Sequence, residues 1–161
     1  MKMGIDIQEY LTKLGQEKFR SIIIHAKPQS EVVLRHYACQ INNKFSGDHL
    51  DVLAHFIADS QLASEVDRFT PDHFKNLLQD KSKGQRLFTV DRSDFLLDTW
   101  RKSERQAFYR MIHRQWNSFI ESMGATLIFC LQTSDEIESL KINDSRGITG
   151  VHRLDEFNEL I

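Results

Sequence analysis

The sequence predicts an α/β domain in which helices cover both faces of a mainly parallel sheet. Three short runs of almost continuously apolar residues, at 22–24, 87–90 and 127–131, are typical of strands that are buried on both faces. Segments with apolar residues at helical spacing separate these runs, and strands that alternate with helices favour a parallel sheet. The length of 161 residues matches one domain, so we treat residues 1–161 as a single unit.

The expected helices begin at capping residues. Asp6 precedes a helix at 7–14, and Ser30 precedes a second helix. Thr70, followed by proline and aspartate, indicates a third helix, and a fourth is expected at about 103–123. In the second helix apolar side chains recur every fourth residue, at Val33, Tyr37, Ile41 and Phe45.

Two segments are harder to interpret. Residues 50–58 fit neither the strand period nor the helix period, so either structure remains open there. Residues 150–154 form a short strand candidate near the end of the chain.

The composition argues for a cytoplasmic protein without a general affinity for polyanions. The formal net charge is -2, which gives no overall attraction to nucleic acid or acidic lipid. No apolar run is long enough to span a bilayer, and residues 1–6 lack the apolar region of a signal peptide. Cys39 and Cys130 stand among hydrophobic neighbours and are expected to be buried free thiols. The seven histidines show no ligand spacing, so we expect no metal site.

The polar ends of the predicted strands occur in a distinctive order. A strand, turn and helix span 22–45, a second strand ends in Asp91, and a third ends in Gln132-Thr133-Ser134. This order resembles the phosphate loop, Walker B strand and sensor strand of ASCE-type P-loop ATPases, which carry an extra strand between the first two. The resemblance covers about residues 20–135. It implies a P-loop NTPase-like three-layer core with its ligands at the carboxyl ends of the strands.

The phosphate-loop motif itself is degenerate. A functional loop reads G-x-x-x-x-G-K-[ST], because glycine backbone, lysine and hydroxyl together hold phosphate and magnesium. Here His25 and Ser30 stand at the glycine positions, Glu31 at the lysine position and Val32 at the hydroxyl position. Lys27 is a cation of the turn, but at a different place in the pattern.

The Walker B region keeps one of its two expected acidic residues. Asp91 stands where an aspartate would organise magnesium, whereas Arg92 stands where many such ATPases carry the glutamate that activates water. We therefore expect a degenerate nucleotide site with no catalytic residues and no bound cofactor. Its residues would be His25, Lys27, Ser30, Glu31, Asp91, Arg92 and Thr133.

Residues 87–98 also resemble the Walker B region of the BrxF family, small P-loop proteins of some BREX phage-defence systems. In both, an acidic strand end leads into an apolar-acidic segment. The intact phosphate loop of that family is absent from this sequence. The resemblance implies an accessory subunit of a bacterial phage-defence or DNA-processing complex.

A basic and aromatic segment offers a second candidate surface. Residues 101–124 carry five Lys or Arg side chains against two glutamates. Basic residues interleaved with aromatic residues can bind nucleic acid, and tryptophan and arginine are enriched at protein interfaces. The alternative is an ordinary solvated helix whose aromatic residues belong to the core. The residues concerned are Trp100, Arg101, Arg105, Tyr109, Arg110, Arg114 and Trp116.

The leading functional hypothesis is a non-catalytic, ATPase-like accessory subunit that acts through contacts with a protein partner. One alternative is an atypical ATPase of such a complex, which would require Lys27 and Asp91 to converge on a phosphate. Another is a nucleic-acid-binding module that uses the helix at 101–116. Self-association remains open, and no membrane partner is expected.

Overall fold

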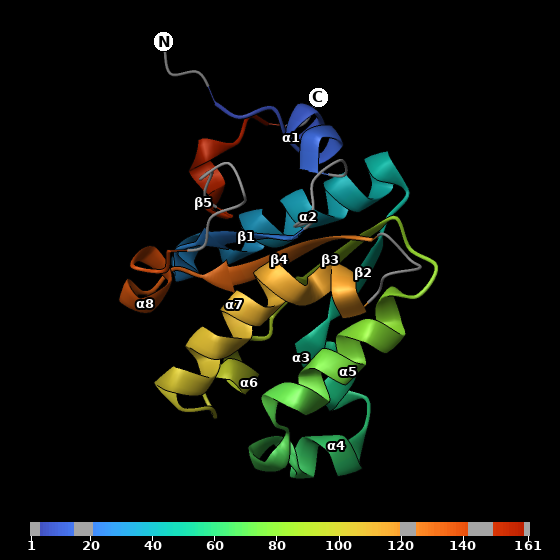
Figure 1. The fold of residues 1–161 in the computed structure, drawn as a ribbon, viewed down its shortest axis with the longest axis vertical. Coiled ribbons are helices and arrows are strands. Elements are labelled where there is room, and N and C mark those ends of the chain that lie inside the picture. Colours follow the sequence, from blue (N-terminus) through green and yellow to red (C-terminus); the bar gives the residue numbers. More distant parts are fainter. Residues whose placement is uncertain (1–3, 15–20, 120–124, 142–149, 160–161) are drawn as a thin grey trace.

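A computed structural model of the chain describes residues 4–14, 21–119, 125–141 and 150–159, with side chains of 114–119 left out. Its sheet has five parallel strands in the order β2-β3-β4-β1-β5 (Figure 1). The strands are β1 Ser21–Ala26, β2 Asp48–Asp51, β3 Leu87–Asp91, β4 Thr126–Gln132 and β5 Val151–Arg153. The prediction of a parallel sheet is therefore confirmed, and the three apolar runs form its three inner strands.

The central strand is β4, which lies between β1 and β3. Ser21 pairs with Leu127 on one side, and Leu87 pairs with Thr126 on the other. The strand that comes third among the apolar runs thus separates the first two in space. This is the arrangement that the ATPase resemblance implies.

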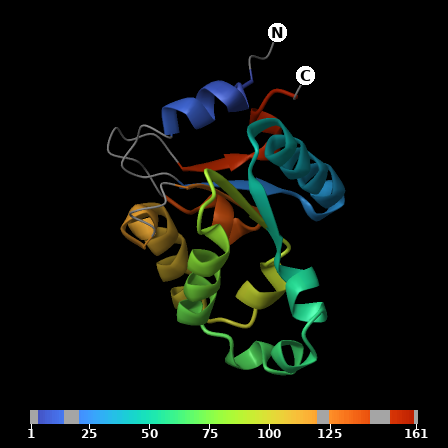
Figure 2. The same cartoon turned by 90° about the vertical axis from the view of Figure 1, so that its right-hand side faces the viewer.

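Helices form a layer on each side of the sheet (Figures 1 and 2). Helices α1 (Ile7–Leu14) and α2 (Glu31–Phe45) pack on one face. On the other face pack α3 (Val52–Ile57), α5 (Pro71–Ser82), α6 (Asp94–Leu97) and α7 (Lys102–Phe119). Shorter elements are α4 (Ser60–Ser64), α8 (Asp135–Glu138) and the 3-10 turns η1 (Pro28–Ser30), η2 (Val66–Arg68) and η3 (Leu154–Glu156).

Each buried strand contributes to two cores because successive side chains point to opposite faces. Ile22 and Ile24 pack with α1 and α2, whereas Ile23 packs with the other helix layer. In that second core the ring of Phe129 on β4 lies 5.9 Å from Phe74 and 6.0 Å from Phe108, centroid to centroid. The sheet is therefore covered on both faces, as its apolar strands require.

The predicted caps are partly confirmed. Asp6 Oδ1 accepts the N–H groups of Gln8 and Glu9 at the start of α1, and Thr70 caps α5. Ser30 precedes α2 but makes no side-chain capping bond. The ambiguous segment 50–58 contains both the end of β2 and all of α3, which explains why it fits neither period.

Among the described residues, no helix is both long and apolar enough to cross a membrane.

Candidate functional site

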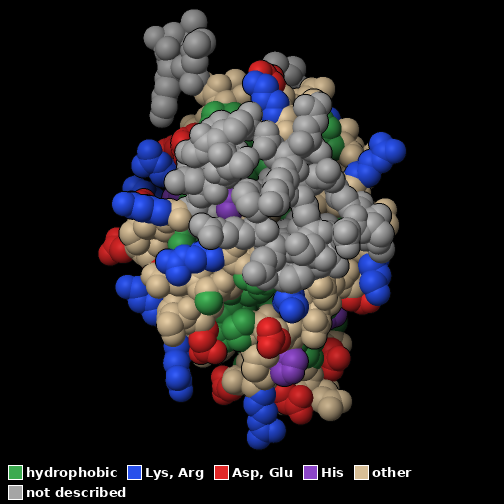
Figure 3. All heavy atoms as spheres, in the orientation of Figure 1, with side chains coloured by type: hydrophobic (Ala, Val, Ile, Leu, Met, Phe, Trp, Pro, Cys, Tyr) green, Lys and Arg blue, Asp and Glu red, His purple; other side chains and the backbone are tan. Residues whose placement is uncertain are grey.

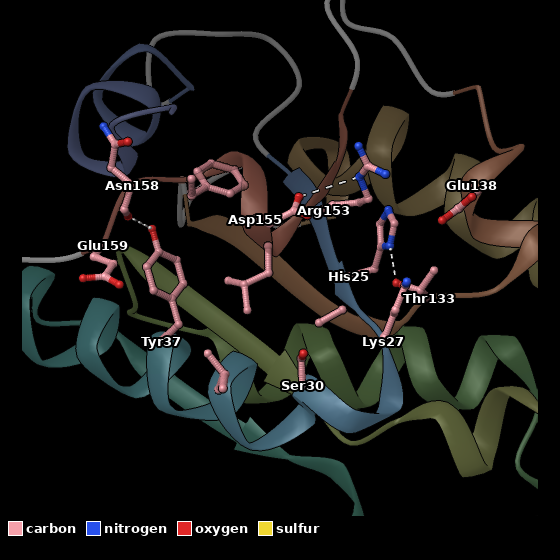
Figure 4. Close-up of a pocket in the computed structure, with 14 residues that line it drawn as sticks. His25, Lys27, Ser30, Tyr37, Thr133, Glu138, Arg153, Asp155, Asn158 and Glu159 are labelled. Carbon is pink, nitrogen blue, oxygen red and sulfur yellow. Dashed lines mark hydrogen bonds and ion pairs between the residues drawn. The ribbon is translucent and has the colours of Figure 1, made fainter. Parts of the chain in front are cut away.

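The residues predicted to bind nucleotide fall into two separate groups at the carboxyl edge of the sheet. His25, Lys27, Ser30 and Thr133 line a pocket of about 480 Å³, which is drawn in Figure 4. Glu31, Asp91 and Arg92 instead border a hollow of only about 10 Å³. Lys27 and Asp91 therefore face different spaces. One of those spaces is far too small to hold a phosphate group.

The turn after β1 has few free backbone donors. Ser30 N–H donates to the carbonyl of Lys27, and Glu31 N–H donates to the carbonyl of Pro28. Pro28 has no N–H at all. A phosphate loop binds phosphate through several free backbone N–H groups. In this turn two of the N–H groups already donate to carbonyls of the turn itself.

Asp91 ends β3 with its carboxylate buried, since only 2% of the residue is exposed. Two basic side chains of the same chain, Arg35 and His49, lie beside it. Arg35 Nε is 3.3 Å from Oδ2, and His49 Nε2 is 3.1 Å from Oδ1. These are ion-pair contacts without the alignment of hydrogen bonds. The carboxylate therefore has intramolecular partners in the place where a magnesium site would need an open face.

His49 is held in position by a buried hydroxyl. Thr89 Oγ1 lies 2.6 Å from His49 Nδ1 and accepts the side-chain amide of Asn42 at 2.6 Å. The one proton of this hydroxyl has two acceptors within reach, His49 Nδ1 and the carbonyl of Asp48 at 3.5 Å. On the other side of the ring, His49 Nε2 lies 3.1 Å from Asp91 Oδ1.

Arg92 forms a structural ion pair. Its backbone is left-handed, with φ of 53°, and its guanidinium binds both carboxylate oxygens of Asp51. Burial raises the pKa of Asp51, but the bonds from Arg92 and the Ala54 N–H, with the charge of Arg35, bring that pKa below its usual value. The bond to Asp51 in turn raises the pKa of Arg92. Arg92, the residue that follows Asp91 at the end of β3, therefore links β3 to Asp51 of β2.

The larger pocket lies between α2 and the segment that follows β5. Figure 4 shows His25 and Arg153 at one end and Tyr37 with Asn158 at the other. His25 Nδ1 is 2.8 Å from Thr133 Oγ1, and the hydroxyl of Tyr37 donates to the carbonyl of Asn158 at 3.2 Å. Burial lowers the pKa of His25. The imidazole is therefore neutral at physiological pH.

Sequence reasoning missed the wall formed by residues 153–159. Arg153 belongs to β5, and its Nε lies 3.7 Å from Asp155 Oδ1. Glu138, Asp155 and Glu159 place acidic groups around the same pocket. The one signal for this wall was the short strand at 150–154, which the structure confirms as β5.

The basic and aromatic segment is only partly a surface. Trp100 and Tyr109 are buried in the core, and Trp100 Nε1 donates to the carbonyl of Phe69 at 2.8 Å. Arg105 forms an ion pair with Glu136 at 2.9 Å. Of this set, Arg101 and Arg110 are exposed. The side chains of Arg114 and Trp116 lie outside the described residues.

The charges on this face of the molecule do not form a continuous basic surface. On the face that carries α7, the side chains of Lys and Arg are dispersed among acidic ones over the coloured part of Figure 3. Trp100 and Tyr109 are not available to stack on bases. The contrary expectation, that these two rings belong to a binding surface, does not fit their burial.

Within the described part of the chain, no three His, Cys, Asp or Glu side chains are grouped so that they could hold a metal ion. In comparisons with known proteins, no protein-family model, curated protein or solved structure matches this chain. What stands is an α/β fold with a five-stranded parallel sheet. The relation to the BrxF family remains a prediction.

Proposed function

We propose that this protein is a non-catalytic relative of P-loop ATPases that acts through contact with a protein partner, in a bacterial phage-defence or DNA-processing complex. The observation that carries the proposal is the state of Asp91. Arg35 and His49 flank its carboxylate in a hollow of about 10 Å³. An ATPase of this plan needs that space for magnesium and the terminal phosphates.

The topology supports the ancestry. Strand β4, which Thr133 follows, lies between β1, which leads into the loop-like turn, and β3, which ends in Asp91. Asp91 also lies at the carboxyl edge, where ligands of parallel sheets bind. This strand order is consistent with an ATPase-like scaffold, while the turn at Lys27–Ser30 has no glycine, and Ser30 N–H and Glu31 N–H already donate to its carbonyls.

Exposed apolar residues support the contact with a partner. Val32 is 76% exposed and Val33 is 59% exposed, side by side in the first turn of α2. Val33 also lines the pocket of about 480 Å³. Single exposed apolar side chains are common, but two adjacent ones at the rim of a pocket suit a protein interface.

We expect no saturable heat when ATP and magnesium are titrated into the protein by calorimetry, even at millimolar nucleotide. The reason is that Glu31 places negative charge beside the turn and that Arg35 and His49 already flank the carboxylate of Asp91. A micromolar isotherm that is lost in Asp91→Ala would contradict the proposal and support the ATPase alternative.

The partner contact has its own test. The protein would be co-expressed with the products of neighbouring genes, and stable complexes would be isolated. Complex formation that Val33→Asp abolishes and Ile57→Asp leaves intact would support the proposal, because Ile57 is even more exposed than Val33 but belongs to α3. Salt-sensitive binding of DNA or RNA, without any protein complex, would favour the nucleic-acid alternative instead.

A further inference from the structure

A second pocket, of about 410 Å³, opens at the carboxyl ends of β3 and β4 beside α6, α7 and α8. Its charged lining is mainly acidic. Four carboxylates and two basic side chains contribute, namely Asp94, Asp98, Asp135, Glu136, Lys102 and Arg105. The formal charge of this lining is therefore -2, from four negative and two positive groups.

One of the two basic side chains, Arg105, already has partners within the protein. Arg105 Nε lies 2.9 Å from Glu136 Oε2, and Nη2 lies 3.3 Å from Oε1 of the same residue. Nη1 donates to the carbonyl of Trp100 at 2.6 Å. Arg105 and Glu136 thus neutralise each other, which leaves Asp94, Asp98 and Asp135 against the single ammonium of Lys102.

Tyr109 supplies an unpaired polar group. The residue is only 4% exposed, and its hydroxyl forms no hydrogen bond within the part of the chain that the structure describes. Burial, then the charge of Glu136, raises the pKa of this phenol, so the hydroxyl keeps its proton at neutral pH. Tyr109 lines the pocket together with Asp94 and Asp98, whose charges also act on the phenol. A buried tyrosine hydroxyl normally has a partner.

Asp94 is the most enclosed of the three unneutralised acids. One of its oxygens accepts the N–H of Gln132 at 2.9 Å. Among the described residues, no cationic side chain lies within ion-pair distance of it. The pocket therefore joins a carboxylate that has no cationic partner to a phenol that has no hydrogen bond to another described residue.

Resting on the proposed contact with a protein partner, we propose that this pocket receives the guanidinium group of an arginine side chain of that partner. A guanidinium is planar and has five N–H donors, which suit the carboxylates and the phenol oxygen. The negative lining excludes phosphates and other anions. Arginine is also among the side chains that contribute most to protein interfaces.

The proposal has a consequence for stability, which we expect to increase in Asp94→Asn at neutral pH. Burial raises the pKa of Asp94 above its ordinary value of 3.8, and the nearby charges of Asp98 and Glu31 add to this effect. Because the pKa is raised in the folded state, stability falls as the pH rises above 3.8, and the loss is complete once the pH exceeds the folded-state pKa. The asparagine keeps the acceptor for Gln132 and removes the charge.

Urea denaturation over a range of pH measures this effect. The advantage of Asp94→Asn should be present at pH 7 and should vanish as the pH falls toward 3.8. Asp72→Asn is the matched control, because Asp72 is an exposed acid of α5 away from the pocket. A variant that is less stable than the parent at pH 7 would show that the carboxylate has a structural partner.

Binding is tested with N-acetyl-arginine amide, which presents the side chain of an internal arginine, in an NMR titration. We expect saturable millimolar binding that Asp94→Asn weakens about tenfold. Tyr109→Phe removes only the hydroxyl, so it should weaken binding without lowering stability. Asp72→Asn should bind like the parent protein. Loss of stability in Tyr109→Phe with unchanged binding would assign the hydroxyl a structural role and overturn the proposal.

Two further ligands test whether the pocket requires a positive charge and whether it prefers a protein side chain to a polyamine. The neutral analogue with citrulline should not bind, because it lacks the charge. Tighter binding of spermidine than of the arginine derivative would overturn the assignment to a protein side chain, as would the absence of saturable binding. Calorimetry with ATP is independent of this assay. If the protein binds both ATP and the arginine derivative, the proposed function is refuted and the arginine pocket is not. If it binds neither ligand, the arginine pocket is refuted and the proposed function is not.

Discussion

Replacing Phe129 by alanine is expected to destabilise the protein by about 3–5 kcal/mol, because a large cavity would remain in the core. Phe129 is 1% exposed and lies on the central strand β4. Its ring meets Phe74 and Phe108, which stack on each other with centroids 5.3 Å apart. These three rings join the sheet to α5 and α7, so the cavity would separate a strand from two helices.

Chemical denaturation of the purified variant measures this loss. Ile57→Ala serves as the control, since Ile57 is 70% exposed and its truncation should change stability by no more than about 0.5 kcal/mol. A loss below about 1 kcal/mol for Phe129→Ala would show that this ring is not a core residue.

The second large effect concerns the buried carboxylate. Changing Arg35 and His49 together to glutamine should cost about 3–5 kcal/mol, because Asp91 would remain buried without a cationic partner. The effect is expected from these two residues because both contact the Asp91 carboxylate directly. Arg35 Nε lies 3.3 Å and His49 Nε2 lies 3.1 Å from the Asp91 carboxylate, and neither carboxylate oxygen has a hydrogen-bond partner among the described residues.

A third substitution provides the control for this result. Adding Asp91→Asn to the double variant removes the uncompensated charge and should restore most of the lost stability. Equal stability of the double and triple variants would indicate that the loss came from the packing of Arg35 and His49, and not from their charge. Denaturation at low and high salt would distinguish the two further, because a buried charge is screened less than an exposed one.

The sequence was a good guide to the inner strands and to the longer helices. Residues 22–24, 87–90 and 127–131 are buried on both faces, and such strands have an unmistakable composition. The edge strand β2 was not recognised because it has only four residues, three of which are polar, and a helix follows it without a loop. Short polar edge strands carry little periodic signal.

The site was predictable only in part. The degeneracy of the turn could be seen in His25, Ser30 and Glu31, since a motif is local in sequence. The partners of Asp91 could not be seen, because Arg35 and His49 reach it from two other elements. The basic and aromatic segment misled for a related reason: Trp100 and Tyr109 face the core, while Arg101 and Arg110 face the solvent.

The pairing of β1 has a consequence for the synthesis of the protein. Both neighbours of β1 in the sheet are translated late, since Ser21 pairs with Leu127 and Ile23 pairs with Val151. The apolar residues of β1 therefore have no strand partner while most of the chain leaves the ribosome. Folds built on such distant pairings form slowly, and their exposed strands favour aggregation. We expect the nascent chain to need chaperone protection until β4 has emerged.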